Sequence, residues 1–146
     1  MISRILVPVD GSEHSKNALE FACDLAKHYD AEVNLLHVVQ SVHYDRVMVL
    51  GASRVTIHMN QEEMEKAGNS VLEAANAIAE EQGVKAINMS IESGPPAETI
   101  LAESKNKDID LIVMGSRGLS DIGGLMLGSV SHKVNHLAKC TCVTVK

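Results

Sequence analysis

The segment Leu111-Ile-Val-Met-Gly-Ser-Arg-Gly-Leu-Ser-Asp-Ile-Gly-Gly-Leu-Met-Leu-Gly-Ser-Val-Ser-His132 contains the clearest structural signal in the chain. It opens with four apolar residues, Leu111 to Met114, a length and composition typical of a buried strand. Glycines follow at positions 115, 118, 123, 124 and 128, and apolar residues recur with helical spacing after Ser129. The segment therefore predicts a strand, a glycine-rich loop and the start of a helix.

This arrangement suits a bound anion. Glycines let the backbone approach a ligand closely, and a helix N-terminus presents unpaired N–H groups and the positive end of its dipole. A phosphate is the usual occupant of such a place. The alternative is a long surface loop whose glycines only relieve turns, but five glycines within residues 115–128 favour the phosphate interpretation.

The rest of the chain alternates between strand and helix patterns. Apolar runs at 5–9, 32–39 and 142–145 predict strands, and an imperfect alternation at 84–92 predicts a more exposed one. Helical spacing follows Ser12, covers 61–82, resumes after Pro96 and begins again at Ser129. We therefore expect one α/β domain over 1–146, with an open, doubly wound sheet of five parallel strands and helices on both faces.

Three details of this pattern carry separate expectations. Residues 40–60 show no clean period, so we expect a flexible segment near the ligand. Gly68 interrupts the helix over 61–82 and indicates close packing. His37 stands alone in an apolar strand and is expected to be a structural residue.

Composition excludes several classes of protein. Hydrophobic residues make up 45% of the chain with one Phe, two Tyr and no Trp, so the core must be aliphatic. The net charge is −6 without a basic run, which argues against nucleic-acid binding. No segment has membrane-spanning length, and the N-terminus lacks a signal-peptide layout. The three cysteines follow no secreted-domain pattern, so we expect a cytoplasmic protein.

The spacing Gly115-x2-Gly118-x9-Gly128-Ser129 resembles the ATP-binding signature of the universal stress protein family. Residues 5–12 resemble the first strand and turn of that family, residues 35–39 its second strand, and residues 140–146 its closing strand. Two departures are Thr141, where the family usually has proline, and a loop in which Asp121, Gly123 and Gly124 replace a frequent basic residue.

The resemblance implies a strand order of 3-2-1-4-5, ATP as ligand and a homodimer formed through the last strand. Because the chain is acidic and the loop has no lysine, Mg²⁺ or Mn²⁺ would have to offset the phosphate charge. In this picture backbone N–H groups of the loop face the phosphates, Gly115 lies against the ribose and the backbone of Val38 contacts adenine. The implied site residues are Pro8, Val9, Asp10, Val38, Met114, Gly115, Arg117, Gly118, Gly128, Ser129 and Val130.

Three of these assignments have simpler alternatives, and a pair of histidines outside the list raises the question of a metal site. Asp10 follows the first strand and could contact the nucleotide or only form the turn. Val38 could be a plain core residue, and Arg117 could be a solvated loop charge instead of a phosphate contact. His132 and His136 share a helix face, but two ligands do not close a metal site.

Motifs of competing enzymes are absent from the sequence. It contains no GxxxxGK[ST] loop, no GxGxxG after the first strand and no GxSxG nucleophile elbow. We assign no catalytic residue and favour a nucleotide-dependent switch of the stress response. The alternatives are a slow ATPase or nucleotidyl-transfer enzyme on the same scaffold, and a protein that dimerises without nucleotide.

Overall fold

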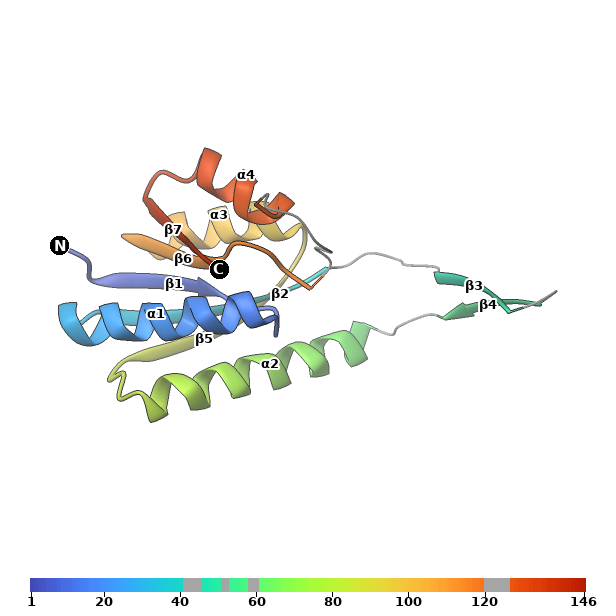
Figure 1. The fold of residues 1–146 in the computed structure, drawn as a ribbon, viewed down its shortest axis with the longest axis horizontal. Helices are drawn as coiled ribbons and strands as arrows, with labels where there is room; N and C mark the ends of the chain where they lie inside the picture. The colour runs from blue at the N-terminus through green and yellow to red at the C-terminus, as the bar shows by residue number, and fades with distance from the viewer. Residues whose placement is uncertain (41–45, 51–52, 58–60, 120–126) are drawn as a thin grey trace.

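The computed structural model describes residues 1–40, 46–50, 53–57, 61–119 and 127–146, with the side chains of 46–50 and 53–57 excepted (Figure 1). Strands and helices alternate through most of the chain, as the sequence pattern predicts. The elements are β1 (Arg4–Pro8), α1 (Glu13–Tyr29), β2 (Glu32–Val39), β3 (Arg46–Leu50), β4 (Ser53–Ile57), α2 (Gln61–Glu81), β5 (Ile87–Ser93), α3 (Pro96–Asn106), β6 (Leu111–Gly115), α4 (Ser129–Leu137) and β7 (Thr141–Val145).

The main sheet has five parallel strands in the order β5-β2-β1-β6-β7. Numbered along the chain within this sheet, the order is 3-2-1-4-5, so the expected topology is confirmed. The direction of winding reverses between β1 and β6, where Ile5 pairs with Leu111 and Leu6 with Ile112. In open α/β sheets, ligands bind beyond the carboxyl ends of the strands at such a reversal.

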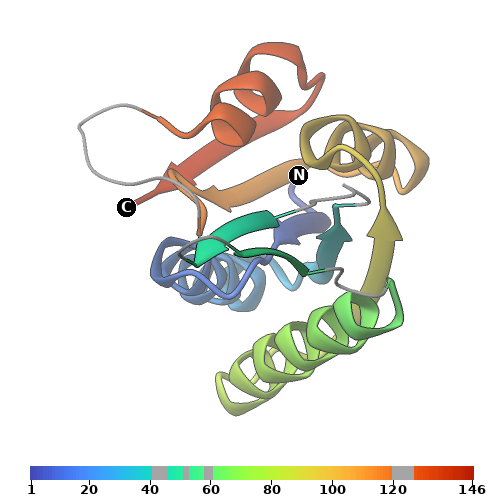
Figure 2. The ribbon, with the colours of Figure 1, turned by 90° about the vertical axis from the view of Figure 1, so that its right-hand side faces the viewer.

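Helices cover both faces of this sheet. Figure 2 looks at its carboxyl end, with α1 and α2 below the strands and α3 and α4 above them. Side chains of β1 alternate accordingly: Ile5 and Val7 belong to the cluster on the α1–α2 face, and Leu6 to the cluster on the α3–α4 face. These three side chains are 0% exposed, which explains why the central strands are continuous apolar runs.

The third strand of the main sheet begins later than the sequence pattern suggests. Val84 was expected to start it, but the Val84 N–H donates to the Ala79 carbonyl at 3.1 Å and closes the end of α2. Pairing with β2 starts only at Ile87, opposite Val33. The expectation of an exposed strand is confirmed, because β5 lies at the edge of the sheet and Met89 is 50% exposed.

Part of the 40–60 segment has regular structure, which sequence reasoning did not predict. β3 and β4 form a separate two-stranded antiparallel sheet, with Val47 opposite Thr56 and Val49 opposite Arg54. Two runs rich in β-branched residues, separated by Gly51 and Ala52, are a usual hairpin signal. The remaining residues of this segment, apart from Gln40, lie outside the described ranges.

The described helices do not include one that is both long enough and apolar enough to cross a membrane.

Candidate functional site

The turn after β1 and the glycine-rich segment after β6 meet at the carboxyl end of the sheet. Asp10 Oδ2 accepts the Leu119 N–H at 3.3 Å. A Cβ added to Gly118 would lie 2.7 Å from the same oxygen, so the glycine allows the two segments to touch. The structure therefore brings together Asp10 and the first part of the loop, as expected for a site at the reversal of the sheet.

Asp10 also forms the turn that leads into α1. Its Oδ1 accepts the Ser12 N–H at 2.9 Å, and Ser12 in turn caps the helix by accepting the Ser15 N–H at 3.2 Å. The simpler interpretation of Asp10 as a turn-forming residue is thus correct. Because the second oxygen reaches Leu119, the same side chain also ties this turn to the glycine segment.

Gly115 is required by packing. A Cβ at this position would lie 2.8 Å from the His14 carbonyl carbon and 2.9 Å from His14 Cβ. The end of β6 therefore lies directly against the first turn of α1. Ser116 Oγ adds a hydrogen bond of 3.2 Å to His14 Nδ1 at the same contact. A backbone approach to ribose, which the resemblance implies for Gly115, is compatible with this packing but is not needed to explain the glycine.

The N-terminus of α4 is fixed to the end of β6 through Ser116. The Ser116 carbonyl accepts the Gly128 N–H at 2.7 Å and the Ser131 hydroxyl at 2.9 Å. The Ser116 N–H donates to the Val145 carbonyl at 2.7 Å, which joins the same residue to β7. Sequence reasoning missed Ser116 and Ser131 as organising residues, because Ser116 bonds to residues that lie far from it in the sequence.

This network corrects one detail of the expected phosphate contacts. The Gly128 N–H was expected to face the ligand, but it is already donated to Ser116. Gly128 is the N-cap of α4 and has no side chain to cap the helix. The N–H groups of Ser129 and Val130, in the first turn, have no carbonyl partner within the helix. Ser129 is exposed and Val130 is half-buried, so the donors of this turn lie near the surface.

The remaining predicted residues lie at the same end of the sheet but differ in burial. Pro8 ends β1 opposite Leu36. Val9 and Met114 are only 5% and 3% exposed and point into opposite faces of the core, so a ligand in the crevice would meet little of their side chains. The Val9 backbone is engaged as well, because its N–H donates to the Leu36 carbonyl at 2.8 Å and its carbonyl accepts from His37 at 2.8 Å. Val38, on β2, is half-buried against the α3–α4 cluster. Its expected backbone contact with adenine therefore stays a prediction.

Arg117 is half-buried between Ser116 and Gly118. The segment that links Leu119 to Leu127, with Gly123 and Gly124, lies outside the described residues. The two α4 histidines, His132 and His136, are both exposed. Within the described ranges, no group of three or more His, Cys, Asp or Glu residues is placed to hold a metal ion.

His37 of β2 and Gly68 of α2, singled out in the sequence, pack against each other next to Val9. The Val9 carbonyl lies 2.8 Å from His37 Nδ1, and because a carbonyl only accepts, Nδ1 carries the proton. A Cβ on Gly68 would lie 2.6 Å from His37 Cδ2. The structural role expected for His37 and the close packing expected at Gly68 are therefore confirmed.

Known proteins resemble the chain over its whole length. The model of the universal stress protein family matches residues 1–146. Universal stress protein YxiE of Bacillus subtilis is 40% identical over 149 residues, covering 100% of both chains. A solved universal stress protein in complex with cAMP is 27% identical, with a TM-score of 0.73 over 99% of this chain and 97% of its own. A family protein of Arabidopsis thaliana with AMP bound is 25% identical, with a TM-score of 0.66 over 99% of this chain and 91% of its own. The chain thus belongs to the universal stress protein family.

Proposed function

We propose that this protein binds ATP with Mg²⁺ or Mn²⁺ in the crevice where β1 and β6 end, and that occupancy by ATP switches its interactions during the stress response. The observation that carries the proposal is the contact of Asp10 with Gly118 and Leu119. It joins the turn after β1 to the glycine segment, while Ser116 holds the N-terminus of α4 to the same segment.

Solved relatives support an adenine nucleotide as the ligand. The relatives at 27% and 25% identity hold cAMP and AMP, respectively. ATP is the choice for this chain because its glycine spacing, from Gly115 to Ser129, resembles the ATP-binding signature of the family. The extra phosphates of ATP would be bound by the free N–H groups of Ser129 and Val130 and by the exposed Ser129 hydroxyl.

The metal ion would be held chiefly by the nucleotide. Both carboxylate oxygens of Asp10 already accept backbone N–H groups, from Ser12 and Leu119. No other carboxylate takes part in the described contacts of the crevice, and one protein ligand is too few for a metal site. The cation would serve to neutralise phosphate charge that helix N–H groups offset only partly.

Calorimetry with ATP, ADP and AMP, with and without Mg²⁺, tests this proposal. We expect saturable binding of ATP with metal at low-micromolar to millimolar affinity, and loss of binding in Gly128→Val. Gly128 is buried, and added bulk there would displace the first turn of α4 from Ser116. Absence of heat with every nucleotide at millimolar concentration, or parent-like binding by Gly128→Val, contradicts the assignment.

The alternative is a slow ATPase or nucleotidyl-transfer enzyme on the same scaffold. Fast phosphoryl transfer needs a positioned base and a cationic clamp on the transferred group. Asp10, whose carboxylate contacts Leu119, already accepts two backbone N–H groups, which makes it a poor general base. We expect turnover far below the roughly 1–100 s⁻¹ of kinases. A steady-state rate above about 1 s⁻¹ that Asp10→Asn abolishes would favour the enzyme.

We also propose a homodimer formed through β7. This strand ends the order of the described five-stranded sheet, so one of its edges is available for pairing. Its residues Cys142, Val143 and Val145 are apolar and half-buried. Light scattering at tens of micromolar should give the mass of two chains, and a strictly monomeric mass contradicts the proposal.

A cytoplasmic location is part of the same proposal. Cys23, Cys140 and Cys142 are all free thiols, as expected for a protein of a reducing compartment. Cell fractionation should recover the protein with cytoplasmic markers, and recovery with secreted material would contradict this assignment.

A further inference from the structure

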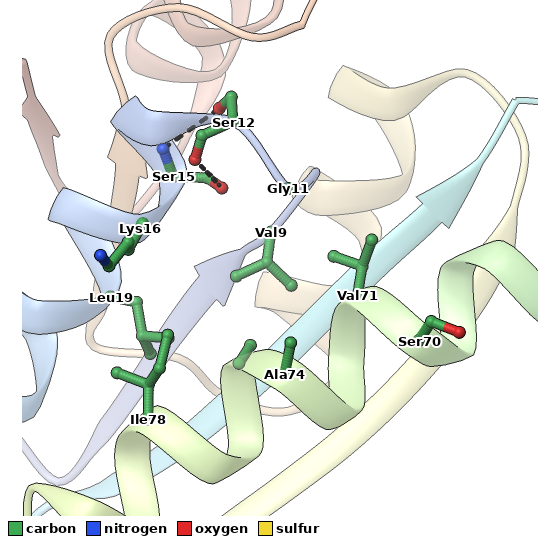
Figure 3. Close-up of a pocket in the computed structure, with 11 residues that line it drawn as sticks. Val9, Gly11, Ser12, Ser15, Lys16, Leu19, Ser70, Val71, Ala74 and Ile78 are labelled. Carbon is green, nitrogen blue, oxygen red and sulfur yellow. Dashed lines mark hydrogen bonds between the residues drawn. The ribbon is translucent and has the colours of Figure 1, made fainter.

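A hollow of about 350 Å³ lies between α1 and α2, on the helical layer opposite α3 and α4. Figure 3 shows it beneath the turn at Gly11 and Ser12, with Val9 of the strand exit facing Val71 of α2. This volume is within the range of small-molecule sites. Its apolar lining comes from both helices and the end of β1: Val9, Leu19, Val71, Ala74, Ala75 and Ile78.

Most polar groups around this hollow are already satisfied. The Ser15 hydroxyl donates to the Ser12 carbonyl at 3.0 Å, and the Ser70 hydroxyl donates to the Lys66 carbonyl at 3.1 Å. The Ser12 oxygen accepts a backbone N–H, which leaves its own proton to donate. Since that hydroxyl lies over the first turn of α1, away from the apolar lining (Figure 3), the interior offers a ligand few hydrogen bonds.

Lys16 supplies the only charge among the lining residues. Within the described part of the chain its ammonium group forms no ion pair, whereas Lys27, Lys85, Lys107 and Lys133 each pair with a carboxylate. No acidic residue lines the hollow. A cation at the rim of an apolar hollow matches a ligand with one anionic group and an otherwise apolar body.

We propose that this hollow binds a small aliphatic carboxylate, of the size of a medium-chain fatty acid. Its chain would lie between Val71, Ala74 and Ile78 of α2 and Leu19 of α1, replacing water against apolar surface. Its carboxylate would lie at the rim, within reach of the Lys16 ammonium. Sugars and nucleotides do not fit, because their hydroxyl and amine groups would lose water without finding partners.

The site is separate from the proposed nucleotide crevice. It lies on the α1–α2 side of the β1–α1 turn, and it shares with the predicted nucleotide residues only Val9, whose side chain belongs to the α1–α2 core. The proposal therefore does not depend on nucleotide binding. Ala74 is exposed at the opening of the hollow, so a larger side chain there can fill it without entering the buried core.

Titration of the full chain with octanoate, followed by calorimetry and by NMR chemical shifts, tests the proposal. We expect saturable binding at micromolar to low-millimolar concentration, with shifts confined to α1 and α2. Ala74→Phe should weaken binding at least tenfold. The matched control is Ala77→Phe, because Ala77 is exposed on the same helix but does not line the hollow.

Lys16→Gln supplies an independent arm that leaves the hollow intact. It should weaken octanoate at least tenfold and leave the binding of 1-octanol unchanged, because the alcohol has no charge to lose. Absence of saturable octanoate binding overturns the proposal. Parent-like affinity in Ala74→Phe, or equal octanoate affinity in Lys16→Gln and the parent, overturns it as well.

Discussion

The carboxylate of Asp10 lies against the backbone of Gly118, with only 2.7 Å between Oδ2 and the position that a Cβ on Gly118 would take. Asp10 is held in place from two sides, by the N–H groups of Ser12 at 2.9 Å and Leu119 at 3.3 Å. The carboxylate therefore cannot move aside for a side chain at position 118 without giving up one of these hydrogen bonds.

Gly118→Ala should consequently displace the glycine segment from the turn after β1. We expect ATP affinity to fall about tenfold or more, equivalent to about 1.4 kcal/mol, because the loop would no longer lie over the crevice. The free energy of unfolding should fall by about 1 kcal/mol, the usual net value of one hydrogen bond. Calorimetry and urea unfolding measure the two effects.

Gly83→Ala is the matched control. Gly83 has φ +81° at the end of α2, and a Cβ there would meet nothing within 4 Å. The substitution should cost about 1–2 kcal/mol of stability through backbone strain and leave ATP affinity unchanged. If Gly118→Ala binds ATP like the parent, the Asp10–Gly118 contact has no part in the site.

Gly68→Ala should destabilise the protein although Gly68 lies inside a helix. Alanine ordinarily gains about 0.5–1 kcal/mol over glycine in a helix. Here its Cβ would lie 2.6 Å from His37 Cδ2 and 2.8 Å from Ile91 Cδ1, and the hydrogen bond to Val9 holds the His37 ring. Overpacking costs about 1–3 kcal/mol, which exceeds the gain.

Chemical unfolding of Gly68→Ala measures this balance. Asn69→Ala, at an exposed position of the same helix, serves as control and should be neutral or slightly stabilising. A higher unfolding midpoint for Gly68→Ala than for the parent would show that α2 does not pack this closely on β2 and β5.

The cysteine thiols should react slowly in the native protein. Burial raises the pKa of Cys23 to about 11 and that of Cys142 to about 11, and burial also raises the pKa of Cys140. A raised pKa lowers the thiolate fraction at pH 8, and the thiolate is the reactive form. Alkylation by iodoacetamide, followed by mass spectrometry, should be roughly tenfold or more slower than in the urea-unfolded chain. Equal rates would contradict the burial of these side chains.

Asp110 should make stability depend on pH in the acid range. Its carboxylate accepts the N–H groups of Ser3 at 2.7 Å and Arg4 at 3.0 Å, and these hydrogen bonds lower its pKa below the ordinary value of 3.8. The charged form is therefore favoured in the folded state. Its contribution is present above pH 3.8 and is lost as pH falls through the lowered pKa.

Asp110→Asn should lower the unfolding midpoint at pH 7 and flatten its decline below pH 4, as thermal unfolding across pH can show. Asp108→Asn is the comparison. The Asp108 side chain is 89% exposed, and its Oδ2 lies 3.8 Å from Arg4 Nη1. An exposed ion pair of this kind contributes little. Equal effects of the two substitutions would show that the hydrogen bonds to Asp110 do not stabilise the fold.

Much of the fold follows from patterns between residues that are close in the chain. The apolar run at Leu111–Met114 and the helical spacing after Ser129 predict β6 and α4, because burial on two faces or on one stripe requires these periods. Strand order came from the resemblance and not from periodicity. The hairpin of β3 and β4 was missed, since a short alternating pattern resembles an irregular loop until its two halves are paired.

The same distinction between local patterns and contacts of distant segments applies to the candidate site. Gly115 and Gly118 could be singled out from the glycine-rich composition of the loop and from its resemblance to the family's signature, because glycine is the residue that permits a close backbone approach. The partners of these glycines could not be predicted. Gly115 packs on His14, Gly118 faces Asp10, and the Gly128 N–H donates to the Ser116 carbonyl. Each of these contacts joins segments that the sheet order or the returning α4 brings together. A hydrogen-bond donor or a missing Cβ is encoded by one residue, whereas its acceptor or neighbour is chosen only when distant segments pack.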